Sequence, residues 1–269
     1  MGIDFEQEQP IITFEGLFAH TPFLKQMHTI LGTLQEALGY PIDIEFAHDG
    51  TDFYLLQCRA QSHSEDSIAV TIPENIPQEK IIFSANRYVS NGSISDVTHI
   101  VYIDPQKYSE LKDYQDLLAV GRAIGELNKC LPKRQFILMG PGRWGSRGDI
   151  KLGVNVTYSD INNTAMLIEI ARKQKDYVPE PSFGTHFFQD LVEASIYYLP
   201  LYPDDADIVF NEKFFTTLPN ILTDLVPVYG HLADVIRVID IPASTEGQFL
   251  QVLMNADQEL AVAILSESH

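Results

Sequence analysis

The sequence predicts an α+β protein in which mixed β-sheets pack against helices. The chain has 269 residues, of which 45% are apolar and 20% charged, which is enough to bury a sizeable core. Segments with helical periodicity and segments with strand-like alternation both occur, and they follow one another without an internal repeat. We expect a small helix-plus-hairpin part in residues 1–70 and a larger mixed α+β domain in residues 75–269.

The charge and cysteine content exclude several classes of protein. The net charge is −19, from 37 acidic and 18 basic residues, which argues against a nucleic-acid or anionic-membrane partner. No apolar run approaches the roughly 18 residues that span a bilayer, and the acidic N-terminus lacks a signal core, so we expect a cytoplasmic protein. Cys58 and Cys130 form neither a disulfide framework nor a metal motif, and we expect two buried thiols.

A helix is predicted directly after residue 21. Thr21 is a candidate N-cap, Pro22 suits the first helical position, and Gly39 suits the stop. Between them, one apolar stripe follows the helical period: Phe23, Met27, Ile30, Leu31, Leu34 and Leu38. We therefore expect a helix that packs on one face.

A hairpin is predicted around Asp49-Gly50, because apolar alternation lies on both sides of this turn signal. The loop length decides which side chains meet. A two-residue loop would pair Glu45 with Tyr54 and leave Gln57 on the opposite face of the sheet.

A three-residue loop, Asp49 to Thr51, would bring the polar side chains of the two strands together. It would pair Glu45 with Leu55 and Asp43 with Gln57, with an arginine two residues further along the same face. Carboxylates beside a glutamine and an arginine can bind a divalent metal ion and a polyphosphate. The alternative is the solvated face of a half-buried hairpin.

The segments "IDIEFAHDG" and "FYLLQCR" resemble the end of the ATP-grasp nucleotide-binding region of the phosphoenolpyruvate synthase and pyruvate phosphate dikinase family. In that family, a Glu-hydrophobic-Ala strand precedes an aromatic-hydrophobic-Leu-Gln-x-Arg strand. The resemblance covers about residues 10–60 and implies that Glu45 and Gln57 contact metal or nucleotide and Arg59 contacts phosphate. The usual proline after this arginine is replaced by Ala60.

The same resemblance implies ATP and Mg²⁺ as cofactors and ATP-dependent phosphoryl transfer as the reaction. The family's upstream nucleotide-binding lysine and arginine, its phosphohistidine motif and its phosphoenolpyruvate-binding barrel have no counterpart in this chain. Residues 1–70 are therefore expected to be the C-terminal remnant of an ATP-grasp-like region, incomplete as an enzyme alone. A protein partner or a missing N-terminal ATP-grasp half would complete it.

Residues 80–265 resemble the downstream part of bacterial proteins described as phosphoenolpyruvate/pyruvate-binding domain-containing. The similar segments are "ISDVTHIVYIDPQKY", "LMGPGRWGS" and "SFGTHFFQDLVEASIYYLP". This resemblance brings no assigned catalytic residue.

A glycine-rich loop with two arginines follows the predicted strand "RQFILMG". Its N–H groups and its arginines could hold phosphate or carboxylate, so Gly142, Arg143, Trp144 and Arg147 are candidate ligand contacts. The loop is no Walker motif, because it has no lysine and leads into no helix. The alternatives are that Trp144 stacks on a base or that it only covers the edge of the core.

A second candidate cluster starts a predicted helix after Thr185, which suits an N-cap. His186 and Asp190 lie four residues apart on one face, where they could bind a metal or share a proton. The alternative is an ordinary capped helix, since the other face is apolar. The cluster adds His186 to the candidate contacts.

Further elements complete the larger part. We expect a helical region from Asp104-Pro105 to Leu131, and helices at residues 212–217 and 218–225. Strands are expected in "LGVNVTY", "TAMLIEIAR", "DVIRVIDIP", "GQFLQVLMN" and "ELAVAILS".

These observations predict a nucleotide- or phosphometabolite-binding protein related to phosphoenolpyruvate synthase, whose ligand is a small phosphorylated molecule or a nucleotide. The alternative is a non-catalytic regulatory or assembly module, in which the same residues hold loops together.

Overall fold

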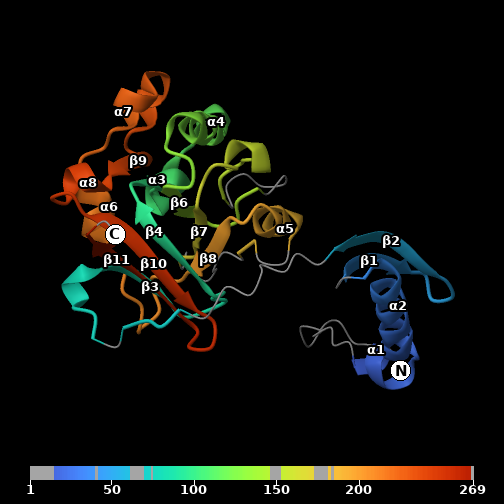
Figure 1. Cartoon of the computed structure of the whole chain (residues 1–269). Coiled ribbons are helices and arrows are strands. Elements are labelled where there is room, and N and C mark those ends of the chain that lie inside the picture. The colour runs from blue at the N-terminus through green and yellow to red at the C-terminus, as the bar shows by residue number, and fades with distance from the viewer. Residues whose placement is uncertain are drawn as a thin grey trace, which may run out of the picture. The chain divides into compact units, whose positions relative to one another are not determined.

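A computed structural model describes residues 15–39, 42–60, 70–73, 75–145, 153–172, 181–182 and 185–267. The chain divides into two compact units, Met1–Ser62 and His63–His269, so the division falls before the interval of residues 70–75 in which the sequence placed it (Figure 1). Each unit is described separately below.

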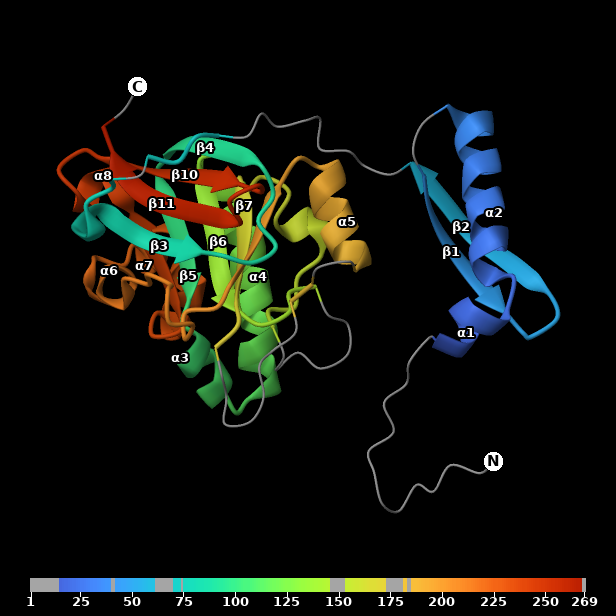
Figure 2. The same cartoon turned by 90° about the horizontal axis from the view of Figure 1, so that it is seen from below.

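The smaller unit is a helix packed on a hairpin (Figure 2). Its elements are α1 Glu15–His20, α2 Phe23–Leu38, β1 Ile42–His48 and β2 Phe53–Ala60. Gly39 ends α2 in the left-handed conformation, at φ 80°, as expected. The helix starts one residue later than expected, with Pro22 in place of Thr21 at the N-cap. The Thr21 hydroxyl donates to the Leu17 carbonyl.

The described residues of the larger unit form two sheets. The four-stranded sheet is antiparallel, in the order β3-β11-β10-β4, with β3 Ile81–Ala85, β4 Gly92–Val97, β10 Phe249–Asn255 and β11 Leu260–Ser266. The five-stranded sheet has the order β8-β7-β6-β5-β9, with β5 His99–Ile103, β6 Phe136–Pro141, β7 Met166–Ile170, β8 Tyr197–Leu201 and β9 Ile236–Asp240. Strands β5 to β8 are parallel and β9 is antiparallel, so the sheet is mixed.

Helices and 3₁₀ turns connect these strands. They are α3 Pro105–Glu110, α4 Tyr114–Cys130, α5 His186–Glu193, α6 Glu212–Thr217, α7 Leu222–Leu225 and α8 Ile241–Ser244, with 3₁₀ turns η1 Gln78–Lys80, η2 Tyr158–Asp160 and η3 Pro227–Leu232. The helix predicted for residues 218–225 is shorter than expected, whereas α6 begins after its predicted cap, Asn211.

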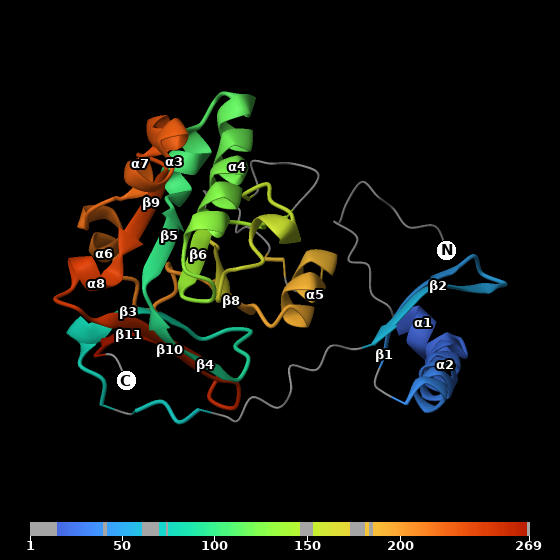
Figure 3. The same ribbon diagram turned by 45° about the horizontal axis from the view of Figure 1, so that its top comes forward.

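The five-stranded sheet forms the middle of three layers (Figure 3). On one face, Val101 and Leu138 pack with Ile124 of α4 in a core shared with the helices. On the other face, Ile100 and Val252 belong to the core shared with the four-stranded sheet. Both faces of the middle sheet are therefore buried, which explains why its strands are apolar at nearly every position.

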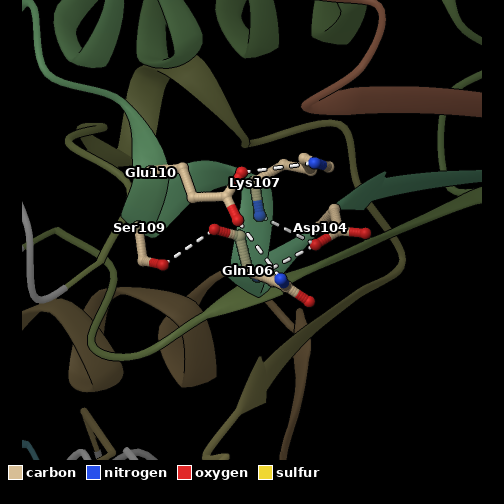
Figure 4. A network of polar contacts seen from close by, with 5 residues as sticks. All are labelled: Asp104, Gln106, Lys107, Ser109 and Glu110. Carbon is tan, nitrogen blue, oxygen red and sulfur yellow. Dashed lines mark hydrogen bonds and ion pairs between the residues drawn. The ribbon is translucent and has the colours of Figure 1, made fainter.

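The predicted helical region after residue 104 is two helices. The Asp104 carboxylate accepts the N–H groups of Gln106 and Lys107, at 2.9 and 3.0 Å, and so starts α3 as expected (Figure 4). The helix ends at Glu110, whose carboxylate accepts from the side chains of both residues, each at 3.2 Å. A second cap, Asp113, then starts α4.

The strand predicted in "LGVNVTY" is absent over residues 153–157. Gly153 makes one isolated bridge to Gly142, and the segment then lies against α4. A Cβ added to Gly121 of α4 would lie 2.1 Å from the Asn155 carbonyl oxygen. Because the glycine leaves room for this main chain, the apolar residues of the segment pack on the helix instead of joining the sheet.

The expectation of two buried thiols is wrong, because neither cysteine is fully buried. Cys130, the last residue of α4, is exposed, and Cys58 is partly buried.

Among the described residues, no helix has both the length and the apolarity needed to cross a membrane.

Candidate functional site

The hairpin loop spans four residues, Asp49 to Asp52, so neither of the two expected loop lengths is correct. The Asp49 carboxylate accepts the N–H groups of Asp52 and Thr51, at 2.8 and 2.9 Å, and the Tyr54 hydroxyl, at 2.9 Å. Hydrogen bonds from the main chain of Asp52 and Thr51 lower the pKa of Asp49 to about 2. Gly50 turns the chain at φ 102°.

A β-bulge sets the register of the hairpin beyond this loop. Phe46 pairs with Leu55, whereas its neighbour Glu45 pairs with Gln57, so Leu56 is the extra residue of β2. The expected pairing of Glu45 with Leu55 is therefore wrong. The bulge nevertheless brings Glu45 and Gln57 directly opposite each other, on one face of the sheet.

This face of the hairpin is acidic and exposed. Asp43 lies two residues before Glu45, on the same face, and both are exposed. The backbone register pairs Asp43 with Arg59. No group of three or more His, Cys, Asp or Glu residues that could hold a metal ion occurs within the described ranges.

The opposite face of the hairpin carries the contact with α2. Phe46 lies between Phe23 of α2 and Phe53, with ring centroids 5.7 and 5.0 Å apart. The polar pair of Glu45 and Gln57 is thus turned away from the helix.

The second candidate lies at the carboxyl end of β6, in residues 140–145, which we call the glycine–arginine loop. Two of its N–H groups donate to main-chain carbonyls of other segments: Gly142 to Ile170 at 3.1 Å, and Gly145 to Val154 at 3.2 Å. Both glycines have positive φ, 62° and 69°. A Cβ on Gly145 would also lie 2.5 Å from the Phe187 ring of α5, so this position requires glycine.

Arg143 and Trp144 occupy different environments within the glycine–arginine loop. Arg143 is partly exposed, whereas Trp144 is 1% exposed and belongs to the core on the helix side of the sheet. The indole lies against Gly140, where an added Cβ would be 2.7 Å from the ring. This burial favours a core role for Trp144 over stacking on a base. Arg147 lies outside the described residues.

The first residues of α5 lie beside the glycine–arginine loop. Thr185 caps the helix, with the Phe188 N–H 3.3 Å from its hydroxyl oxygen, as expected. His186 is the first helical residue and is exposed, and the next residue, Phe187, supplies the ring that contacts Gly145. The structure thus brings two segments together that the sequence treated as separate candidates.

A buried glutamate joins these segments, and the sequence did not single it out. Glu169, the last residue but one of β7, is 1% exposed. Burial raises its pKa to about 7, against hydrogen bonds from Ser182, Tyr198 and Trp144 that act to lower it. Its only signal in the sequence is one acidic residue inside the apolar run "AMLIEIA".

Residues 5–80 match the family described as pyruvate phosphate dikinase, AMP/ATP-binding domain. The match contains α1, α2, β1 and β2 of the smaller unit, including Glu45 and Gln57. The N-terminal part of the chain is therefore similar to this family, and the match confirms the resemblance that the sequence of the hairpin indicated. Neither a curated protein nor a solved structure matches the chain.

Proposed function

We propose that this protein binds an adenine nucleotide and acts in ATP-dependent phosphoryl transfer related to that of phosphoenolpyruvate synthase, with an ATP-grasp-like N-terminal unit that is incomplete as an enzyme alone. The observation that carries the proposal is the direct opposition of Glu45 and Gln57 within the residues that match an AMP/ATP-binding domain. A carboxylate and a carboxamide oxygen at one place suit a cation held by a nucleotide.

The residues on this face fit Mg²⁺ as part of a nucleotide complex. Mg²⁺ is commonly held by one or two carboxylates together with the phosphates of its substrate. Glu45 and Asp43 supply carboxylates, Gln57 supplies a neutral oxygen, and the resemblance assigns phosphate contact to Arg59. The metal ion would neutralise charge on the transferring phosphoryl group, and the side chains would orient it.

The glycine–arginine loop is proposed as a second anion site, in the larger unit. Gly142 and Gly145 give the main chain a positive-φ conformation at the carboxyl end of a parallel strand, and Arg143 between them is partly exposed. Ligands of open α/β sheets commonly bind at this edge. A phosphorylated metabolite is the ligand class that an arginine and main-chain N–H groups favour.

Replacing Glu45 with glutamine is expected to weaken binding of Mg²⁺·ATP about tenfold or more, because a charged contact contributes about 1.5–3 kcal/mol. Binding of ATP without Mg²⁺ should change less, since the carboxylate acts through the metal ion. Isothermal titration calorimetry on the full chain, with and without Mg²⁺, measures both.

Glu36→Gln is the matched control, because it removes the same charge from an exposed position of α2 in the same unit. It should leave Mg²⁺·ATP affinity unchanged. The proposal fails if the wild-type protein binds no adenine nucleotide at millimolar concentration, or if Glu36→Gln weakens binding as much as Glu45→Gln.

Replacing Arg143 with alanine is expected to abolish binding of phosphoenolpyruvate or inorganic phosphate while the melting temperature stays close to that of the wild-type protein. The reason is that a partly exposed guanidinium adds little to stability but much to an anion contact. Thermal-shift measurements over a series of phosphorylated ligands test this. Arg122→Ala, on the exposed surface of α4, removes the same charge and should retain the ligand-induced shift.

A second candidate function, an assembly module, is favoured by the surface of the smaller unit. No residue of α1 or α2 is buried, and most of the exposed large apolar side chains among the described residues are here: Leu17, Phe18, Leu24, Leu38, Phe46, Tyr54, Leu55 and Leu56. Exposed apolar surface on this scale is typical of an interface with another protein. Under this alternative, sedimentation would show association, and no nucleotide would bind.

A further inference from the structure

Glu169 accepts hydrogen bonds from three separate segments of the larger unit. Its Oε1 atom accepts the Trp144 N–H at 2.7 Å and the Ser182 hydroxyl at 2.5 Å. Its Oε2 atom accepts the Ser182 N–H at 2.6 Å and the Tyr198 hydroxyl at 2.7 Å. One buried side chain therefore connects the glycine–arginine loop, the segment that precedes α5, and β8.

Burying a carboxylate among apolar strands is costly unless hydrogen bonds compensate for its lost hydration. Alternation along β7 places Glu169 on the helix side of the sheet, with Leu167, where an apolar residue would satisfy the core. The four donors are all directed at carboxylate oxygens, and two of them are main-chain N–H groups of loop residues. The arrangement thus fixes the main chain of two loop segments to the sheet.

We propose that Glu169 is a positioning residue, which holds the glycine–arginine loop so that Arg143 is presented to an anion. That the loop binds an anion rests on the proposed function; that Glu169 holds the loop does not. Arg143 lies between two anchored N–H groups, that of Gly142 on the Ile170 carbonyl and that of Trp144 on Glu169. Without the second anchor, the next main-chain N–H held after the arginine is that of Gly145, on the Val154 carbonyl, so the residue that directly follows Arg143 loses its main-chain N–H contact.

Glutamine at position 169 could not accept all the hydrogen bonds that the two carboxylate oxygens of Glu169 accept. Each oxygen receives one main-chain N–H, from Trp144 at Oε1 and from Ser182 at Oε2. A carboxamide has an acceptor at one end only, so its NH₂ group would face one of these donors. A hydroxyl donor can turn away, but a main-chain N–H cannot, so one of the two loops must move.

The chain's single tryptophan reports on the loop directly, because it is Trp144. In Glu169→Gln, with far-UV circular dichroism confirming a folded chain, we expect red-shifted Trp144 emission and an acrylamide quenching constant raised several-fold. Tyr198→Phe is the matched control: it removes one donor from the same carboxylate but keeps both main-chain N–H contacts, so emission and quenching should stay as in the wild-type protein.

Binding of inorganic phosphate to the same proteins separates this inference from the proposed function. If the wild-type protein binds phosphate, Glu169→Gln should lower the affinity about tenfold or more, as for loss of a charged contact, and Tyr198→Phe should not. If the wild-type protein binds no anion while Trp144 still responds to Glu169→Gln, the proposed function fails and the positioning role holds. Unchanged Trp144 emission and quenching in a folded Glu169→Gln chain overturns the positioning role.

Hydrogen exchange on the wild-type protein keeps the inference testable if Glu169→Gln does not fold. The Trp144 amide lies in a loop, yet its N–H is held by a buried carboxylate. Exchange measured by NMR should therefore be as slow as for the interior amides of β6. Fast exchange of the Trp144 amide would show that Glu169 does not hold it.

Discussion

Replacing Gly121 with alanine is expected to lower the free energy of unfolding of the larger unit by about 3 kcal/mol, at the upper end of the usual cost of overpacking. In a helix exposed to solvent, the same change would stabilise by up to about 1 kcal/mol. The sign reverses here because a Cβ at residue 121 would lie 2.1 Å from the Asn155 carbonyl oxygen, a main-chain atom that cannot rotate away.

Moving this main chain would disturb the neighbouring contacts of the same segment. The Gly153 carbonyl accepts the Tyr108 hydroxyl at 3.0 Å, and a Cβ on Gly153 would lie 2.1 Å from the Arg143 carbonyl oxygen. The effect of the substitution should therefore reach the glycine–arginine loop. Urea unfolding followed by circular dichroism measures the loss of stability, and Trp144 emission reports the change at the loop.

Two other glycines provide controls for Gly121→Ala. Gly125→Ala, one turn further along α4, would meet only the Asp160 carboxylate, at 3.1 Å, and should change stability little. Gly32→Ala in α2 would meet nothing within 4 Å and should stabilise that helix. If Gly121→Ala is as stable as Gly125→Ala, the packing of the 153–157 segment on α4 is not as described.

Stability that depends on Glu169 is expected to be lost as the pH rises from about 4.5 to about 7. Burial raises the pKa of Glu169 from 4.5 to about 7, so the folded state holds this proton more tightly than the unfolded state does. Its contribution is therefore fully present below pH 4.5, declines as the pH rises above 4.5, and is lost above about pH 7. The expected size is on the order of 3 kcal/mol, from the free energy that corresponds to one pKa unit.

This contribution is measured as a difference between the wild-type protein and Glu169→Gln, each unfolded with urea at several pH values. The free energies of unfolding of the two proteins are subtracted because the contribution of His99 to stability changes with pH in the opposite direction and is present in both. Burial lowers the pKa of His99, so its contribution is present above pH 6.5 and is lost as the pH falls. Glu193→Gln, at an exposed position of α5, should show the wild-type profile. A difference between wild-type and Glu169→Gln that stays constant with pH contradicts the prediction.

Local signals in the sequence predicted most elements correctly. Gly39 ends α2, Asp104 starts α3, and Thr185 starts α5, because caps and stops act through neighbouring residues. The apolar run in β6 likewise predicted a buried strand. Each of these helix ends is set by residues that lie within a few positions of the cap or stop in the chain.

Contacts between distant residues could not be predicted in the same way. Apolar alternation over residues 152–158 predicted a strand. It could not show that the main chain at Asn155 packs against Gly121 of α4, where the absence of a side chain leaves room for the carbonyl. The predicted register of the hairpin was also wrong, because the turn signal at Asp49-Gly50 reveals neither the four-residue loop nor the bulge at Leu56.

The sequence by itself determined the α+β class, the relation of the N-terminal part to an AMP/ATP-binding family, and the residue types at both candidate sites. Only the tertiary structure decided which of these residues meet. It placed Glu45 opposite Gln57 and joined the glycine–arginine loop to the start of α5 through Glu169. A buried charge gains its hydrogen bonds from whichever donors the fold brings to it, and these donors lie 13 to 29 residues away along the chain.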